Sequence, residues 1–563
     1  MAVAAAAPVR SSGIDVTDGE MRKVVFASSL GTVFEWYDFY LYGALATIIA
    51  KHFLSGLSDT AGYVAALMIF AAGFFVRPFG AIIFGRLGDT IGRKYTFLIT
   101  ITIMGLATFL VGVLPSYGAI GMAAPVILIC LRLAQGLALG GEYGGAATYV
   151  AEHSEDNRRG YRTSWIQTTA TLGYFLSLAI LLICQVMGGT DAATRDAAYT
   201  SEWGTWRYPF WISLILLGIS LWIRLQLNES PLFEKMRDEG KLSTAPLSEA
   251  FGNWKNMRIV VLALLGLTAG QAVVWYGGQF YANIFLNKVL QVDAFWTNVM
   301  VAIALVIGTP FFLIFGWLSD KIGRKPIILA GCLLAAVTYF PIFHMIAGAA
   351  NPDLVSASAK SPVTVVADAN DCRLQFDPVG KSKFTSPCDI AKTALVKKGI
   401  PYANVAGTAG TAQIKVGDKV VESYDGAAAD AKAKGEAFGK DLGAALTAAG
   451  YPPKSPINGV NWTVVGLLTI LMIYVTMVYG PIAAMLVEMF PTRFRYSAMS
   501  LPYHIGNGWF GGFLPFIAVA IVAATGDIYS GLWYPVIIAA MTFIIGALFV
   551  AETRGKHLDR QDA

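Results

Sequence analysis

Two carboxylates stand inside a long apolar stretch near the start of the chain. Glu35 and Asp38 belong to the segment GTVFEWYDFYLYG, within an apolar run over residues 24–50. Helical spacing places them on one stripe with Ser28 and Tyr42. An ionised acid at the centre of a bilayer costs about 2.5 to 3.5 kcal/mol on insertion scales. Two such acids therefore require a charged partner, a proton or water.

Other apolar stretches hold groups that can interact with these acids: Arg77, Arg132, Gln135 and Glu142. Arginine does not readily lose its proton, whereas burial favours the protonated form of a carboxyl group. We therefore expect Glu35 or Asp38 to carry a proton, and the sequence leaves open which one does. Arg77 and Arg132 are expected to be counter-charges or anchors for a substrate carboxylate. A static salt bridge, such as one between Glu35 and Arg77, is the structural alternative.

The second half of the chain offers polar aromatic residues more than charges. In LTAGQAVVWYGGQFYANIF, the residues Gln271, Trp275 and Gln279 recur at four-residue steps, as on one helix face. Such a face suits a cavity wall, with interhelical hydrogen bonds and aromatic packing as the alternative. Three later residues are candidates for the same path: Tyr503, His504 and Asn507. Of these, His504 is expected close to the inner surface.

Composition indicates that these residues are positioned by a membrane protein. Hydrophobic residues make up 55% of the chain, charged residues 14%, and the mean hydropathy is +0.57, against about 25% charged residues in soluble proteins. About 20 apolar residues cross a bilayer. The sequence predicts twelve spans, near residues 24–50, 61–86, 96–114, 122–149, 162–187, 207–227, 258–286, 294–318, 326–347, 462–487, 497–524 and 531–551.

A repeated motif divides these spans into two halves. GRLGDTIGRK at 85–94 follows the second span, and GWLSDKIGRK at 316–325 follows the eighth. Recurrence six spans later predicts two related six-helix bundles. The glycines allow close helix approach, and each aspartate can pair with the following arginine or with a neighbouring helix N-terminus. Each motif is therefore expected to form a conformational latch, from Gly85, Asp89, Arg93, Gly316, Asp320 and Arg324.

One connection, residues 350–460 between the ninth and tenth spans, is long, polar and rich in alanine. We expect a small α+β domain there. Asp389 is expected to cap a helix through DIAKTALVKK, a hairpin turns at residues 417–418, and a second helix ends at Gly450. A partly disordered insertion is the alternative.

Basic residues set the expected orientation, since Lys and Arg beside spans are retained in the cytoplasm. Under the twelve-span scheme the short outside loops hold only Lys51, Arg195, Arg207 and Lys288. Both termini are therefore predicted to be cytoplasmic, and the net charge of +5 reflects topology rather than a nucleic-acid partner. The first twenty residues carry no secretory signal pattern. If the chain is bacterial, Cys372 and Cys388 would lie in an oxidising compartment, where a disulfide between them is expected.

The expected organisation is an all-α membrane protein with twelve transmembrane helices in two six-helix halves and a small α+β extramembrane insertion between helices 9 and 10. Its segments are an N-terminal tail at 1–23, a first bundle at 24–227, a linker at 228–257, helices 7 to 9 at 258–349, the insertion at 350–460, helices 10 to 12 at 461–551 and a C-terminal tail at 552–563.

The duplicated G-x-L-x-D-x-x-G-R-K pattern resembles the signature loop of the major facilitator superfamily. Within it, five stretches resemble the metabolite:proton symporter family, whose members carry proline and betaine, α-ketoglutarate, citrate or shikimate: FEWYDFYLYG, RPFGAIIFGRLGD, RLAQGLALGGEYGGA, WRYPF and EMFPTRFRYSA. The resemblance covers all twelve spans, omits the insertion, and implies a coupling role for Arg132. Sugar porters are similar in NESPLFEK, FPTRFR and AETRGK, and drug exporters share R-x-x-Q-G but usually carry a Gly-Pro motif that the fifth span lacks.

These features predict a transporter that imports a small anionic or zwitterionic metabolite with protons, by alternating access around a midplane site. We expect a monomer in the bacterial inner membrane, with the insertion on the periplasmic or extracellular side. No metal-ligand pattern, nucleotide-binding loop or nucleophile triad is found, so we expect no enzyme activity and no cofactor besides the proton. The alternatives are a proton-independent facilitator, an exporter, or a sensor whose insertion binds the ligand.

Overall fold

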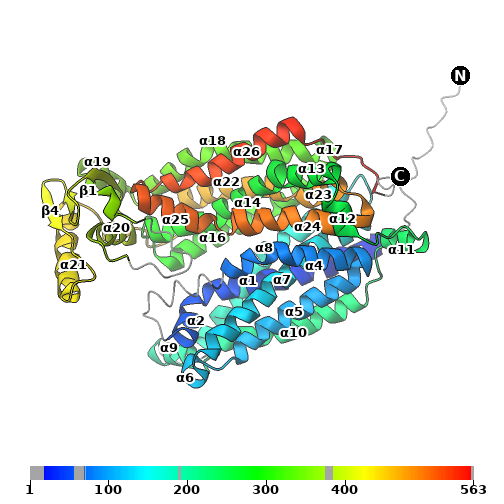
Figure 1. Cartoon of the computed structure of the whole chain (residues 1–563), viewed down its shortest axis with the longest axis horizontal. Helices are drawn as coiled ribbons and strands as arrows, with labels where there is room; N and C mark the ends of the chain where they lie inside the picture. The colour runs from blue at the N-terminus through cyan, green and yellow to red at the C-terminus, as the bar shows by residue number, and fades with distance from the viewer. Residues whose placement is uncertain (1–17, 56–68, 70, 188–191, 374–383, 559–563) are drawn as a thin grey trace.

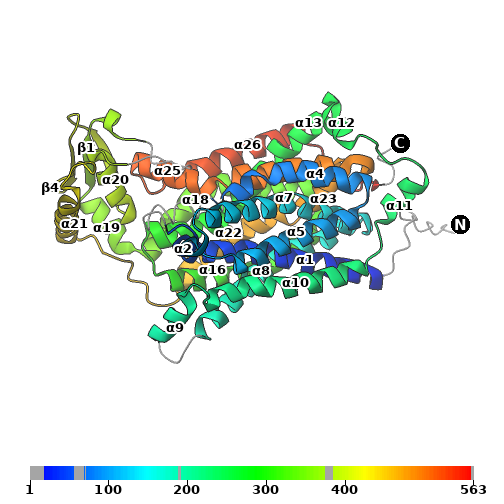
Figure 2. The same ribbon diagram turned by 60° about the horizontal axis from the view of Figure 1, so that its bottom comes forward.

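The computed structural model describes residues 18–55, 69, 71–187, 192–373 and 384–558. Long helices form two bundles that lie along each other, and a small mixed domain stands at one end of the second bundle (Figure 1). The short helices that link the bundles lie at the opposite end (Figure 2). The last described residues also lie there, since the Thr492 hydroxyl donates to the Leu558 carbonyl at 2.9 Å. We call this the linker end of the molecule.

The first bundle and the linker contain the helices up to residue 251. Their bounds are α1 (Asp18–Ala44), α2 (Ala46–Phe53), α4 (Arg77–Thr90), α5 (Arg93–Val113), α6 (Tyr117–Ile120), α7 (Ala123–Glu152), α8 (Arg159–Val186), α9 (Ala192–Thr200), α10 (Tyr208–Leu225), α11 (Pro231–Asp238) and α12 (Pro246–Phe251). Short 3₁₀ helices in the chain cover Thr205–Arg207, Ala369–Asp371, Thr492–Phe494 and Ser530–Leu532.

The second bundle contains several helices with π-helical turns. Its helices are α13 (Trp254–Ala263), α14 (Ala269–Tyr276), α15 (Ala282–Ile284), α16 (Ala294–Gly308), α17 (Pro310–Ile322), α18 (Arg324–Ala350), α22 (Trp462–Tyr479), α23 (Ile482–Met489), α24 (Arg495–Ile505), α25 (Leu514–Thr525) and α26 (Trp533–Phe549). The π-helical segments are Leu264–Thr268, Gly277–Tyr281, Phe285–Val289 and Gly506–Gly511. Such turns shift the register of the side chains that follow them.

Ten helices of the described residues are long and apolar enough to cross a membrane. They run over Arg93–Val113, Ala123–Glu152, Arg159–Val186, Thr205–Leu225, Trp254–Val289, Ala294–Ile322, Arg324–Ala350, Trp462–Met489, Thr492–Thr525 and Ser530–Phe549. These match the predicted third to twelfth spans. The predicted first span corresponds to α1 and α2, which fall outside that set, and much of the second lies outside the described residues. The count of twelve stays a prediction.

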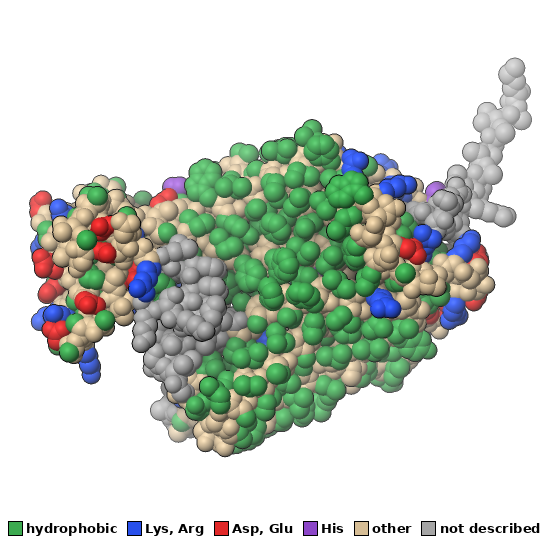
Figure 3. Space-filling model, in the orientation of Figure 1, with side chains coloured by type: hydrophobic (Ala, Val, Ile, Leu, Met, Phe, Trp, Pro, Cys, Tyr) green, Lys and Arg blue, Asp and Glu red, His purple; other side chains and the backbone are tan. Residues whose placement is uncertain are grey.

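The side chains on the surface fit this arrangement. Hydrophobic side chains cover the middle of the face in Figure 3, and charged side chains gather at its two ends. Large apolar residues that are more than half exposed include Ile215, Trp222, Val306, Val337, Ile544 and Leu548. A belt of this kind matches the hydrocarbon core of a bilayer rather than water.

Between α18 and α22 lies a four-stranded sheet with helices. Its elements are α19 (Pro352–Lys360), β1 (Val363–Ala367), α20 (Pro387–Lys397), β2 (Tyr402–Ala406), β3 (Ala412–Val416), β4 (Lys419–Glu422) and α21 (Ala431–Ala448), with strand order β2-β1-β3-β4. Strand β1 pairs parallel with β2 (Val363 opposite Tyr402) and antiparallel with β3 (Val363 opposite Val416). The expected hairpin is present, with Gly417 at φ 56° between β3 and β4.

Two details of this domain refine the sequence expectation. Ser386, not Asp389, caps α20, because the Ser386 hydroxyl accepts a hydrogen bond from the Asp389 amide at 3.1 Å. Asp389 instead accepts from the Arg373 amide at 2.9 Å. Cys372 and Cys388 are joined by a disulfide, which ties the start of α20 to the segment after β1.

The domain is attached to two long helices at the end opposite the linker end. The Tyr402 amide donates to the Gly526 carbonyl at 2.9 Å, and the Asn404 side chain donates to the Thr525 carbonyl at 2.9 Å. Both carbonyls lie at the C-terminal end of α25, where the last turn of a helix leaves its carbonyls without helical partners. One hydrophobic cluster runs from Leu290 at the end of the seventh predicted span into Leu395 of the domain. The domain is thereby packed onto the second bundle.

Candidate functional site

Asp38 lies in a hydrogen-bonded chain that leads to Arg132. The Thr108 hydroxyl of α5 donates to Asp38 Oδ2 at 2.9 Å, and the Ser213 hydroxyl of α10 donates to Asp38 Oδ1 at 3.1 Å. Gln135 of α7 donates to Thr108 Oγ1 at 2.7 Å and accepts from Arg132 Nη1 at 2.9 Å. Asp38, Arg132 and Gln135 were predicted from the sequence as site residues, whereas Thr108 and Ser213 were not. The fold joins four helices through them.

Tyr42 completes this part of the first bundle. The Arg132 guanidinium lies 4.6 Å from the centroid of the Tyr42 ring, a distance at which a cation is attracted to the ring face. Both side chains are buried, with exposures of 3% and 1%. The three predicted site residues Asp38, Tyr42 and Arg132 are therefore close neighbours.

Glu35 and Arg77, unlike Asp38 and Arg132, are not joined to each other through hydrogen bonds or an ion pair among the described residues. Among the described residues the Glu35 carboxylate has no hydrogen bond or ion pair, and its Oε2 atom is fully buried. Arg77 Nε is likewise buried without a partner. The Arg77 guanidinium lies over the Phe74 ring, 4.5 Å from its centroid, and 5.8 Å from that of Phe39. A static Glu35–Arg77 salt bridge is therefore not formed in this structure.

Glu142, the third expected acid, is already paired. Its Oε1 atom accepts from Arg224 Nη2 at 2.6 Å, and its Oε2 atom accepts from the Thr100 hydroxyl at 2.8 Å. The Arg224 guanidinium also stacks 3.4 Å from the centroid of the Phe97 ring. Arg224 passes Gly31 so closely that a Cβ at Gly31 would lie 1.7 Å from its Nη2. Arg224, three residues before the end of the predicted span 207–227, was not predicted from the sequence as a site residue.

The three residues expected to form one stripe on the seventh span have different contacts. Gln271 exchanges two hydrogen bonds with Asn507, at 3.2 and 3.0 Å. The Trp275 ring lies 5.1 Å from that of Trp36 in the first bundle. Gln279 donates to the Met472 sulfur, its one hydrogen bond among the described residues. The π-helical turn Gly277–Tyr281 begins after Trp275 and contains Gln279, so the four-residue steps of the sequence do not continue as a regular α-helical face.

Aromatic rings from both bundles meet at the centre of the molecule. Tyr143 of α7 stacks on Tyr503 of α24 with a centroid distance of 3.6 Å, and the Tyr503 and Tyr479 hydroxyls are 2.8 Å apart. Phe39 contacts Phe280 at 5.7 Å. Stacked and edge-to-face rings allow two bundles to separate and meet again without stranding hydrogen-bonding groups.

The linker end holds two charge clusters that bridge the bundles. In the first charge cluster, Asp89 at the end of α4 accepts from the Tyr496 and Ser497 amides of α24 at 3.2 and 2.8 Å, and from the Ser497 hydroxyl at 2.7 Å. Asp89 also lies 3.3 Å from Arg93. Arg93 and Arg495 both contact Glu152 Oε1, at 3.6 and 2.9 Å. The residues of this cluster are Asp89, Arg93, Glu152, Glu229 and Arg495.

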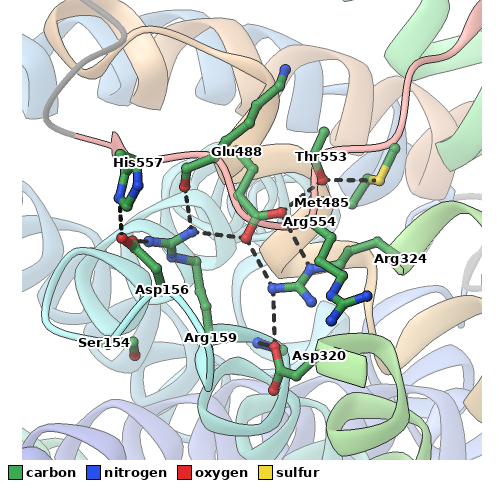
Figure 4. A network of polar contacts seen from close by, with 12 residues as sticks. Ser154, Asp156, Arg159, Asp320, Arg324, Met485, Glu488, Thr553, Arg554 and His557 are labelled. Carbon is green, nitrogen blue, oxygen red and sulfur yellow. Dashed lines mark hydrogen bonds and ion pairs between the residues drawn. The ribbon is translucent and has the colours of Figure 1, made fainter. Parts of the chain in front are cut away.

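The second charge cluster is centred on Glu488 and is drawn in Figure 4. Asp320 of α17 accepts from the Gly160 and Tyr161 amides of α8 at 2.9 and 2.8 Å and lies 3.0 Å from Arg324. Glu488 Oε1 contacts Arg324 at 3.0 Å and Arg159 at 2.8 Å. The cluster consists of Asp320, Arg324, Glu488, Glu552 and Arg159.

The two clusters repeat the same geometry. Gly92 and Gly323 connect the paired helices with φ values of 121° and 109°, which favour glycine. A Cβ at either position would lie within 2.6 Å of a carboxylate oxygen, of Glu229 or of Glu552. Glu229 accepts from the Arg93 amide at 3.1 Å, and Glu552 from the Arg324 amide at 3.0 Å.

Glu229 lies outside the long helices. Burial raises the pKa of its carboxyl group, while hydrogen bonds from the Ser230 and Lys94 amides oppose that rise. Glu229 lies in NESPLFEK and Glu552 in AETRGK, two stretches that resemble sugar porters. No role was predicted for either glutamate from the sequence. Glu152, Glu488, Arg159 and Arg495 were also missed, although their positions repeat between the halves.

The glycines of the two motifs allow the bundles to contact each other closely. A Cβ at Gly85 would lie 2.8 Å from the Ser497 Cα, and one at Gly316 would lie 2.4 Å from the Ser164 Cβ. The predicted latch residues thus occupy the contact between the bundles.

Comparisons with known proteins bear on the fold and the family. The model of the Major Facilitator Superfamily matches residues 28–359, and that of the sugar (and other) transporter family matches residues 442–563. The proton:xylose symporter XylE resembles the structure with a TM-score of 0.60 at 15% sequence identity, covering 97% of this chain and 98% of XylE.

Relatives with assigned names are similar over part of the chain. The proline/betaine transporter of Escherichia coli is 35% identical over 344 residues, which is 59% of this chain and only 66% of that protein's length. The shikimate transporter of the same species is 33% identical, over 57% of this chain and 72% of its own length. A putative metabolite transport protein of Haemophilus influenzae is 28% identical over 96% of both chains.

These matches confirm the family predicted from the duplicated motif. The family model covers more than half of the chain, and the XylE fold extends over nearly all of it. The chain therefore belongs to the Major Facilitator Superfamily.

Proposed function

We propose that this protein imports a small anionic or zwitterionic metabolite together with protons, by alternating access between its two bundles. The observation that carries the proposal is the contrast between Glu35 and the linker end. A buried carboxylate without a partner is costly unless it takes up a proton or meets a cation. Among the described residues Glu35 is such a group, whereas Asp38 is also buried but accepts hydrogen bonds from the Thr108 and Ser213 hydroxyls.

Protonation of an interior acid and binding of the substrate would occur in the same arrangement of the bundles. The two charge clusters hold the linker end closed through hydrogen bonds between helix N-termini and aspartates. Opening that end requires these contacts to break, and loading of the interior would shift the balance between the two arrangements. A neutralised Glu35 lowers the cost of moving the loaded carrier.

The relatives support the substrate class. They are named for proline and betaine, shikimate, and α-ketoglutarate, which all carry a carboxylate. We further propose the bacterial inner membrane as the location, both termini in the cytoplasm, the insertion outside, a monomer as the working unit and the proton as the only coupling ion. Twelve transmembrane helices belong to this proposal.

Transport by reconstituted vesicles with and without an imposed pH gradient tests it. L-Proline, glycine betaine, shikimate and α-ketoglutarate serve as radiolabelled probes. Glu35→Gln or Asp38→Asn should abolish accumulation driven by the gradient and leave part of the exchange measured without one, since exchange moves no net proton. Glu155→Gln, which alters an exposed carboxylate at 54% side-chain exposure, should keep both activities.

Other outcomes identify the competing functions. Uptake that ignores the gradient would indicate a facilitator, and gradient-driven loss of substrate from the vesicles an exporter. A sensor would bind a probe without moving it. If both neutral variants accumulate substrate as the wild type does, with equal protein in the vesicles, Glu35 and Asp38 do not carry the coupling proton.

A further inference from the structure

The second bundle contributes to the centre of the molecule a buried histidine whose ring nitrogens have no hydrogen-bond partner among the described residues. His504 in α24 has 2% exposure, and neither Nδ1 nor Nε2 has a hydrogen-bond partner among the described residues. Buried side-chain polar atoms in folded proteins are mostly hydrogen-bonded, so an imidazole with two such nitrogens requires an explanation. Asn507, one turn along, satisfies its amide through Gln271.

The packing of two helices places His504 level with Arg77. Helix α4 and the chain from α24 onward run antiparallel: a Cβ at Gly85 would lie 2.8 Å from Ser497, and one at Gly508 would lie 2.8 Å from the Phe74 carbonyl. The Trp509 indole donates to the Phe75 carbonyl at 3.3 Å, in the same register. His504 lies between these two contacts on its helix, as Arg77 does on the other.

We infer that His504 is a hydrogen-bond donor for a substrate carboxylate, which binds between Arg77 of the first bundle and His504 of the second. A carboxylate has two oxygens with several acceptor positions, so it can accept from a guanidinium and an imidazole together. This inference rests on the proposed function and deepens it, because a ligand held by both bundles couples binding to their relative position. It also restricts the substrate to compounds with a carboxylate.

The surroundings of the pair favour an anion over a cation. Arg77 brings a permanent positive charge that lies over the Phe74 ring and has no ion pair among the described residues. Glu35, a buried acid of the first bundle, also has no ion pair among the described residues, so a protonated Glu35 leaves the arginine charge to be balanced by the ligand. An ammonium group at this position would be repelled by Arg77.

Binding measurements on the purified full-length protein test the inference with His504→Phe. Phenylalanine keeps the ring and removes both donors, and since those donors have no partner within the chain, the melting temperature should stay the same or rise. The dissociation constant for whichever of L-proline, glycine betaine, shikimate and α-ketoglutarate binds should increase about 10- to 100-fold, as expected for a lost hydrogen bond to a charged group. His504→Gln, which restores an N–H donor, should recover part of the affinity.

Two comparisons make the result specific. Ser500→Ala, one turn earlier on α24, also alters a buried hydroxyl without a partner but should leave the dissociation constant unchanged. An analogue without the carboxylate, such as prolinamide, should bind the wild type and His504→Phe alike, so the preference for the carboxylate shrinks in the variant. Wild-type affinity in a folded His504→Phe protein overturns the inference, as does a wild type that binds none of the four carboxylates.

These measurements separate the inference from the proposed function. Binding is measured without a pH gradient, so it is indifferent to whether the protein is a symporter, a facilitator or a sensor. Proton-driven uptake with an unchanged half-saturation concentration in His504→Phe would leave the proposed function intact and refute the role of His504. Carboxylate binding that depends on His504, in a protein without proton-driven uptake, would support the role of His504 and refute the proposed function.

Discussion

Charged side chains at the linker end and charged side chains at the centre of this molecule differ in whether they have ion-pair and hydrogen-bond partners. At the linker end Asp89 and Asp320 each have an arginine and at least two backbone donors. At the centre Glu35 has no partner among the described residues, and one nitrogen of Arg77 is buried without one. Satisfied charges hold one arrangement of the bundles, whereas unsatisfied ones can respond to a proton or a ligand.

Substitution of Glu142 is expected to have the largest effect, because Glu142 is a buried acid of the first bundle that is paired among the described residues, unlike Glu35. Glu142→Gln leaves the buried Arg224 guanidinium without a counter-charge, so we expect a loss of about 3 to 5 kcal/mol in the free energy of unfolding. Thermal unfolding in detergent and the amount of protein in the membrane measure this. Glu35→Gln, which strands no paired cation, is the matched control and should cost far less.

That prediction also revises a role. From the sequence, Glu142 is a candidate site residue that can interact with Glu35 and Asp38. The ion pair with Arg224 and the hydrogen bond from Thr100 favour a structural role instead. A folded Glu142→Gln protein that loses only proton coupling would contradict this view.

The two latches should differ in strength. Asp89→Asn removes an ion pair and weakens hydrogen bonds from three groups of α24, and we expect it to favour opening of the linker end by about 2 to 3 kcal/mol. Among the described residues Asp320 has Arg324 and two backbone donors but no hydroxyl donor, so Asp320→Asn should have a smaller effect. Distances between spin labels on the two bundles at the linker end report the populations.

Substrate binding provides the control for both latch variants. Neither aspartate lies near Glu35 or Arg77, so affinity for a bound probe should persist in both. Complete loss of binding in both would indicate that the clusters are needed for folding rather than for the choice between arrangements.

The Gln271–Asn507 pair offers a milder test within the second bundle. Gln271→Ala leaves the Asn507 amide without its reciprocal partner, and we expect a cost of about 1 to 2 kcal/mol in stability. A double-mutant cycle with Asn507→Ala should show coupling between the two. Gln279→Ala, which loses only a weak contact with the Met472 sulfur, should cost less, and additive effects would show that the amide pair is not a unit.

The smallest effect on transport is expected from the insertion. Replacing residues 352–458 with a short Gly/Ser linker removes contacts with the C-terminal end of α25, such as the Tyr402 bond to Gly526, but no residue of the central site. Uptake per correctly inserted molecule should persist, with a lower melting temperature. Abundant but inactive protein would instead point to a domain that delivers substrate.

The sequence alone determined the class, the duplication and most helices of this protein. Apolar runs about 20 residues long reveal membrane spans because a bilayer imposes a fixed thickness, and a repeated GRK turn reveals two halves because each copy needs the same glycine geometry at Gly92 and Gly323. The hairpin at Gly417 was predictable for the same local reason. Capping of α20 was not assigned correctly, because Ser386 and Asp389 are both good acceptors and only the local fold selects between them.

Only the tertiary structure decided which charges pair. Glu142 and Arg224 are 82 residues apart, and Asp89 meets the α24 amides about 400 residues later, so no periodicity within one helix reveals either contact. The π-helical turns in the seventh span redirect Gln279 through backbone hydrogen bonds that residue types alone do not specify. Helix periodicity predicts which side of a helix is polar, whereas the packing of one bundle against the other decides what that side meets.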